Sequence, residues 1–175
     1  DVTARCVSML AQLGETAQSS KAVAEGIAYL RRTQLAEGSW YGRWGLNYIY
    51  GTWSVLCALN AAGVDHGDPM VRKAVNWLVS TQNPDGGWGE DAVSYRLDYK
   101  GYEQAPSTSS QTAWALLGLM AAGEVEQILV ALRPSLAPDA VVVVERPARD
   151  GFAWPAGFDA LRDKSYGETH LWYGR

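Results

Sequence analysis

The chain has 175 residues, enough for one domain with a sizeable core but few for a multidomain enzyme. Its formal net charge is −4 and 19% of its residues are charged, which leaves no basic surface that could neutralise nucleic-acid phosphates. Its longest apolar run, residues 113–122, is shorter than the roughly 20 residues that a transmembrane helix needs. We therefore expect neither a nucleic-acid partner nor a transmembrane helix in this chain.

Three apolar segments, taken in chain order, share one pattern. Each begins with threonine, ends in glycine and has apolar residues at spacings of three and four. They are TARCVSMLAQLG, TWSVLCALNAAG and TAWALLGLMAAG, at residues 3–14, 52–63 and 112–123. This periodicity predicts helices, and a final glycine is typical of a left-handed helix C-cap. We expect the helices near residues 3–13, 47–62 and 109–122.

A second, more polar helix type alternates with the first. Residues 25–40 align with residues 73–88 without a gap, and this repeat predicts helices near residues 19–34 and 69–81. Helical hairpins of this kind cannot bury their apolar faces alone and must stack on their neighbours. With the apolar helices inside and the polar ones outside, we expect an all-α fold. It would be an α/α barrel (toroid) of helical hairpins, incomplete in this chain.

The same turn follows each polar helix. It combines a glutamine, a glycine and a tryptophan at fixed spacing, as Gln34, Gly38 and Trp40 and again as Gln82, Gly86 and Trp88. The glutamine can bond free carbonyls at the helix end, the glycine can take a left-handed bend, and the indole can cover the helix ends. We interpret these six residues as structural, tying one hairpin to the next, rather than as ligand-binding.

Residues 126–175 break the repeat. Pro134 and Pro138 interrupt any helix, and the valines at 141–144 predict a strand. We expect an irregular C-terminal tail there, which is either divergent or the product of a frame shift.

These strings together resemble the QW repeats of the triterpene cyclases. Residues 38–59, 82–91 and 107–124 are similar to the C-terminal third of bacterial squalene-hopene cyclases, and the resemblance covers about residues 1–125. It implies that residues 1–125 are the C-terminal part of the cyclase catalytic α/α barrel domain. The family cyclises squalene through carbocations to pentacyclic hopene or hopanol, in hopanoid biosynthesis, with no metal or other cofactor. The resemblance further implies a peripheral, monotopic position on the cytoplasmic side of the bacterial inner membrane, and it admits a homodimer.

The resemblance also suggests site residues. Trp44 and Tyr50 match positions that line the family's cavity, and Tyr48 lies between them. Aromatic faces can stabilise carbocations without offering a lone pair that would trap them. The opening string DVTAR resembles a segment that supports the catalytic acid, so Asp1 and Arg5 are candidates for that support. The alternative for the aromatic residues is ordinary packing against helical neighbours.

The family's proton donor is missing from the chain. It is the middle aspartate of an Asp-x-Asp-Asp-Thr motif, which the sequence lacks, and the resemblance places it upstream of Asp1. We therefore expect a fragment that does not cyclise squalene by itself. We interpret the adjacent Glu90 and Asp91 as solvated loop charge. We expect that neither the Asp65–His66 pair nor His170 has a third partner for metal or triad chemistry.

Two other functions stay open. One is a non-catalytic helical-repeat module that binds a lipid or a protein partner through the same aromatic residues, and the missing acid favours it for this chain in isolation. The other is the function of a prenyltransferase, an enzyme class with a similar α/α barrel. Prenyl transfer in that class needs a zinc site, and Cys6, Cys57 and the two histidines are not grouped as zinc ligands would be.

Overall fold

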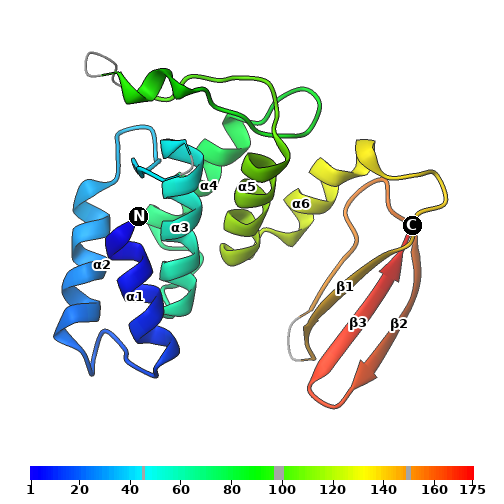
Figure 1. Ribbon diagram of the computed structural model, residues 1–175. Helices are drawn as coiled ribbons and strands as arrows, with labels where there is room; N and C mark the ends of the chain where they lie inside the picture. The colour runs from blue at the N-terminus through cyan, green and yellow to red at the C-terminus, as the bar shows by residue number, and fades with distance from the viewer. Residues whose placement is uncertain (45, 97–100, 149–150) are drawn as a thin grey trace. The chain divides into compact units, whose positions relative to one another are not determined.

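The structure of the chain is a computed structural model, which describes residues 1–44, 46–96, 101–148 and 151–175 (Figure 1). It divides into two compact units, Asp1–Glu124 and Val125–Arg175. The first unit holds α1 (Val2–Gln12), α2 (Lys21–Thr33), α3 (Asn47–Ala61), α4 (Pro69–Ser80), the 3-10 helix η1 (Ala92–Tyr95) and α5 (Ser109–Ala121). The second holds α6 (Val125–Leu132), η2 (Arg133–Ser135), β1 (Val142–Pro147), β2 (Ala160–Tyr166) and β3 (Thr169–Gly174). No helix in the described ranges is both long and apolar enough to cross a membrane.

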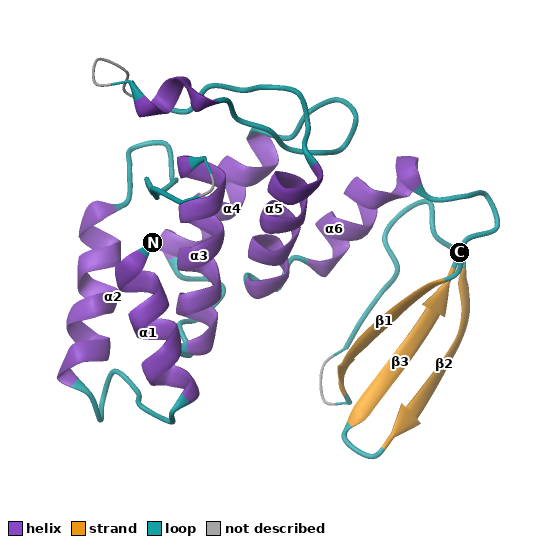
Figure 2. Cartoon of the chain, in the orientation of Figure 1, coloured by secondary structure: helices purple, strands orange, loops and turns teal. Residues whose placement is uncertain are grey.

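In the first unit, α3 packs between α1 and α5, while α2 packs on α1 and α4 packs on α3 and α5 (Figure 2). Helix α3 buries residues around most of its circumference, from Asn47 to Leu59. By contrast, α2 buries a single face formed by Val23, Gly26 and Leu30. An all-round apolar helix belongs in an interior and an amphipathic helix at a surface, so sequence and burial agree. The helical part of the predicted fold is therefore confirmed here, with helix bounds close to those expected.

The apolar helices all end in the same way. Their final glycines have left-handed φ values of 89°, 71° and 83°, at Gly14, Gly63 and Gly123. After α3 the amide of Gly63 donates to the Asn60 carbonyl, and the amide of Val64 donates to the Leu59 carbonyl, both at 3.0 Å. The ends of α1 and α5 repeat this pair of bonds. The pair is the Schellman arrangement, which satisfies carbonyls that a helix end would otherwise leave free.

The second unit is regular, so the expected irregular tail, and with it an all-α fold for the whole chain, is wrong. Its strands form an antiparallel sheet in the order β1-β3-β2. Leu129 of α6 forms a small core with Val144 and Phe158. The predicted valine strand is present as β1. The sequence did not reveal β2 because every residue of that strand is exposed, so the strand has no alternation of apolar and polar residues.

Candidate functional site

Each glutamine of the repeated turns closes its own turn. Gln34 Nε2 donates to the Gly38 carbonyl and Gln82 Nε2 donates to the Gly86 carbonyl, both at 2.8 Å. The two glycines have positive φ, 119° and 84°. Gln34 also donates to the carbonyl of Met70 in α4 at 2.9 Å, so the first turn is bonded to the next hairpin.

Each tryptophan of these turns is buried and links the helix before it to the helix after it. Trp40 Nε1 donates to the Leu30 carbonyl at 2.7 Å, and the Trp40 backbone amide donates to Thr52 Oγ1 at 3.1 Å. Trp88 makes the same two kinds of bond, and its threonine partner is Thr112, at 3.0 Å. These bonds give a physical reason for the threonines that begin the second and third apolar segments, Thr52 and Thr112, which the sequence pattern alone did not explain.

Helix α3 begins in an unusual backbone conformation. Leu46 and Asn47 have φ values of 60° and 42°, which are rare for residues other than glycine. The N-cap position is Leu46, whose apolar side chain cannot accept a hydrogen bond. The acceptor is Glu90, whose two carboxyl oxygens lie 2.9 and 3.1 Å from the Tyr48 amide, with one of them 3.4 Å from the Ile49 amide. Two amides that a helix start leaves unpaired are thus capped by a residue that lies 42 and 41 positions further along the chain.

Glu90 is buried, with 4% of its surface exposed, so the expectation of a solvated loop carboxylate is wrong for this residue. Burial raises the pKa of Glu90 to about 8, against the opposing effect of the Tyr48 and Ile49 amides. A protonated carboxyl group still accepts hydrogen bonds through its carbonyl oxygen, so the cap does not require the charge. The neighbouring Asp91 is half-buried and caps η1 through the amide of Val93, at 2.8 Å.

Tyr48 turns its ring into a group of tyrosines. It meets Tyr41 and Tyr102 edge-on, with ring centroids 5.6 and 6.5 Å away. The Tyr102 hydroxyl donates to the Gly89 carbonyl at 2.9 Å. Burial, and then the nearby charge of Glu90, raise the pKa of Tyr102 to about 12. Tyr48 is only 6% exposed, so its surroundings in this chain are those of a packed side chain.

Arg5 of α1 lies against an aromatic cluster formed by Tyr50 and Trp53 of α3 and Trp114 of α5. The guanidinium carbon is 4.7 Å from the centroid of the Trp53 ring, and Arg5 Nη2 is 3.3 Å from the Tyr50 hydroxyl. Trp53 stacks on Trp114 at 5.9 Å, and Tyr50 meets Trp114 edge-on at 5.2 Å. Ring faces attract cations, so this cluster already holds one positive charge against its π surface.

Asp1 caps α1 and anchors the loop that precedes α3. One carboxylate oxygen accepts from the Val2 amide at 2.5 Å and the other from the Arg43 amide at 3.0 Å. The next residue, Trp44, is 66% exposed. The structure thus brings Arg5 and Tyr50 into contact and ties Asp1 to the loop of Trp44. The roles of these residues towards a substrate remain predictions.

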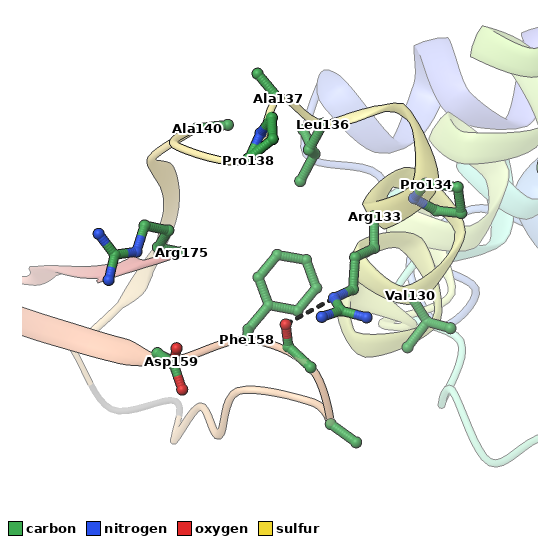
Figure 3. Close-up of a pocket in the computed structure, with 12 residues that line it drawn as sticks. Val130, Arg133, Pro134, Leu136, Ala137, Pro138, Ala140, Phe158, Asp159 and Arg175 are labelled. Atoms are coloured by element: carbon green, nitrogen blue, oxygen red, sulfur yellow. Dashed lines mark hydrogen bonds between the residues drawn. The ribbon is translucent and has the colours of Figure 1, made fainter.

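The second unit has a surface cavity of about 470 Å³ (Figure 3). Arg133 Nε donates to the Gly157 carbonyl at 2.6 Å at its edge, and the apolar side chains of Leu136 and Phe158 line it. None of the site residues predicted from the sequence is among its lining residues.

His170 of β3 contacts both an aspartate and a serine side chain, so the expectation that it lacks a third partner for a triad arrangement is wrong. Its Nε2 is 2.8 Å from a carboxylate oxygen of Asp163, and its Nδ1 is 2.8 Å from the Ser165 hydroxyl. Both partners lie on β2, and Ser165 is the cross-strand partner of His170. The ring also stacks on Trp172 at 4.2 Å. These contacts join β2 to β3, and no group of three His, Cys, Asp or Glu residues in the described part of the chain could hold a metal ion.

Comparison with known proteins gives a consistent set of relatives. Residues 1–133 match the squalene-hopene cyclase C-terminal domain. A protein of Sinorhizobium fredii named "Probable squalene--hopene cyclase" is 87% identical over 131 residues, which are 75% of this chain and 20% of that protein. The squalene-hopene cyclase of Bradyrhizobium diazoefficiens is 79% identical over 131 residues, with the same two shares. That of Zymomonas mobilis is 60% identical over 124 residues, 71% of this chain and 19% of the relative.

The chain therefore spans about a fifth of the length of these curated relatives.

Proposed function

Because the chain belongs to the squalene-hopene cyclase family, we propose that residues 1–125 are the C-terminal part of the catalytic barrel domain of an enzyme that cyclises squalene to hopene or hopanol. Most of the length of its relatives has no counterpart in the chain. The 175 residues alone are then inactive, because they contain no Asp-x-Asp-Asp-Thr donor motif.

The first chemical step explains why the missing acid matters. An alkene is a very weak base, so its protonation needs a carboxylic acid that stays protonated and is polarised by neighbouring groups. In this proposal Asp1 and Arg5 support an acid that the rest of the enzyme contributes. Arg5 is suited to this role because its guanidinium group is already oriented by Trp53 and by the Tyr50 hydroxyl.

The later steps need a surface that tolerates carbocations. Aromatic rings supply one, at about 0.5–2 kcal/mol per desolvated cation–π contact, without a lone pair that would form a bond. The observation that carries this proposal is the contact of Arg5 with the rings of Trp53 and Tyr50. In this contact the ring faces already hold a positively charged group, which is what a carbocation would require of them. Trp44 and Tyr50 are the rings that we propose line the cavity, with Tyr48 between them.

Two incubations test the proposal. In the first, the purified chain is mixed with squalene in detergent and the hydrocarbons are analysed by gas chromatography, and no hopene is expected. Hopene formation would overturn the fragment proposal and make one of the chain's own carboxyl groups the donor.

In the second incubation, residues 1–125 replace the matching segment of the Sinorhizobium fredii relative, and this chimaera should form hopene. An inactive, folded chimaera would contradict the assignment.

A second candidate function is a non-catalytic helical module that binds a lipid or a protein. Large apolar side chains favour it, because Met9 and Leu13 of the first hairpin and Leu117 and Met120 of α5 are about half exposed or more. Large exposed apolar side chains are available to contact another molecule. A folded chimaera without cyclase activity that still binds squalene would favour this second function.

We also propose, from family membership, a peripheral position on the cytoplasmic side of the bacterial inner membrane. Co-sedimentation of the chimaera with liposomes of bacterial lipid would test it, and recovery of the chimaera in the supernatant would count against it. A homodimer is the accompanying proposal, which sedimentation velocity of the detergent-solubilised chimaera would test.

A further inference from the structure

Part of the restraint on the first turn of α3 comes from outside its own segment. Leu46 and Asn47 enter the helix with positive φ, a conformation that residues with a side chain adopt only when their surroundings hold them there. The Tyr48 and Ile49 amides, at the second and third helical positions, both donate to the carboxyl group of Glu90. A local capping side chain normally receives those two amides.

Glu90 is itself held from the side of α5. The Gln111 side chain accepts from the Glu90 amide at 3.1 Å and donates to the Glu90 carbonyl at 3.0 Å. Tyr102 fixes the preceding residue, Gly89, through its carbonyl. Gly89 has no room for a side chain, because a Cβ there would lie 2.1 Å from the Pro106 carbonyl oxygen. The carboxyl group is therefore presented to α3 from a rigid, buried support.

The turn that Glu90 caps carries the side chains of the candidate site. Tyr48 donates its own amide to Glu90, and Tyr50, two residues further on, lies 3.3 Å from Arg5 through its hydroxyl. A helix start without an acceptor for its free amides frays within its first turn. Loss of the Glu90 acceptor would thus move Tyr50 relative to Arg5 through the backbone of α3.

We propose that Glu90 is a positioning residue of the candidate site, which sets the place of Tyr50 against Arg5 by capping the first turn of α3 from the α5 side. The structural part of this proposal concerns the chain alone. Its consequence for catalysis rests on the proposed function.

The structural part is tested by NMR on the full 175-residue chain. Glu90→Ala should shift the ring signals of Tyr50 and the Nε signal of Arg5, because both acceptor oxygens are lost. Glu90→Gln should shift them less, because its amide oxygen can still accept from the Tyr48 amide. The matched control is Asp91→Asn, which removes the neighbouring carboxylate that caps η1 and should leave both signals in place.

A purely structural role for Glu90 would give a different pattern. Glu90→Ala would then melt at a lower temperature while the Tyr50 and Arg5 signals of the folded protein stayed at their wild-type positions, and this result would overturn the proposal. If Glu90→Ala does not fold, the comparison of Glu90→Gln with Asp91→Asn decides in the same way. Identical Tyr50 and Arg5 signals in those two variants would also overturn it.

The catalytic consequence is tested in the active chimaera. Glu90→Ala should lower kcat by roughly 10- to 100-fold with little change in KM, because a misplaced group costs the chemical step more than it costs binding. Asp91→Asn should keep the wild-type kcat. If the unsubstituted chimaera is inactive, the proposed function fails while the NMR result stands. If the chimaera is active and Glu90→Ala keeps its kcat, the positioning role is refuted and the proposed function stands.

Discussion

The carboxyl group of Glu90 lies 2.9 Å from the amide nitrogen of Tyr48, a residue 42 positions earlier in the chain. This bond connects the turn after α4 to the first turn of α3. It places a buried titratable group, whose pKa burial raises to about 8, at the start of the helix that carries Tyr50.

The raised pKa of Glu90 makes the stability of the first unit depend on pH. The ordinary pKa of this carboxyl group is 4.5, and in the folded chain it is about 8. Between these values the folded chain keeps a proton that the unfolded chain has lost, so the stabilisation is fully present below pH 4.5 and is lost as the pH rises through about 8.

Glu90→Gln isolates this effect, because glutamine does not titrate. The unfolding free energy of the wild type minus that of Glu90→Gln should fall with rising pH, by roughly 1 kcal/mol per pH unit within this window. Urea unfolding at several pH values measures the difference. Asp91→Asn is the control. It removes the smallest of the effects that raise the pKa of Glu90, so the fall with pH should remain and should only end at a slightly lower pH. A difference that does not change with pH would contradict the raised pKa.

Trp88→Ala should lower the free energy of unfolding by about 3–5 kcal/mol. The indole is 1% exposed, and its Nε1 donates to the Leu78 carbonyl at 2.8 Å, so truncation leaves a cavity and removes a buried hydrogen bond at the end of α4. Trp44→Ala is the matched control, since Trp44 is exposed, and it should change stability by less than about 0.5 kcal/mol. Equal unfolding midpoints for the two variants would refute a stabilising role for the repeated turn.

Gly38→Ala should destabilise the chain more than Gly14→Ala does. Both glycines have positive φ, but a Cβ on Gly38 would lie 2.4 Å from the Lys73 carbonyl oxygen, whereas one on Gly14 would meet nothing within 4 Å. We expect about 1 kcal/mol for Gly14→Ala from the backbone conformation and more than about 2 kcal/mol for Gly38→Ala. Thermal unfolding followed by circular dichroism measures both. Equal costs would mean that the close approach of the Gly38 turn to α4 is not a constraint.

Trp44→Ala and Tyr50→Ala, made in the active chimaera, should shift the products towards species with fewer rings. Removal of a π face destabilises one cation along the series while the initiating acid stays intact. Gas chromatography of the hydrocarbon products measures the shift, and Tyr29→Ala, at an exposed position of α2, is the control. If both variants gave the native product at the native rate, these two rings would be packing residues only.

Much of the first unit could be predicted from the sequence because its signals are local. Apolar periodicity located three of the five long helices, and the repeat of residues 25–40 at residues 73–88 located the other two. The glycines at positions 14, 63 and 123 marked the ends of the first three. The repeated glutamine and tryptophan led to the family resemblance, which the match over residues 1–133 confirms. Each of these signals acts within a few residues of the chain, so the order of the amino acids is enough to reveal it.

The tertiary structure alone decided the other features, because they depend on which distant residues meet. An adjacent pair of acidic residues looks the same in sequence whether it is solvated or buried, and only the packing of α3 beside α5 made Glu90 a buried cap and left Asp91 half-buried. The partners of Thr52 and His170 were hidden for the same reason. The sheet of the second unit depends on the pairing of β1 with the distant β3, and an exposed strand such as β2 carries no apolar pattern that could announce it.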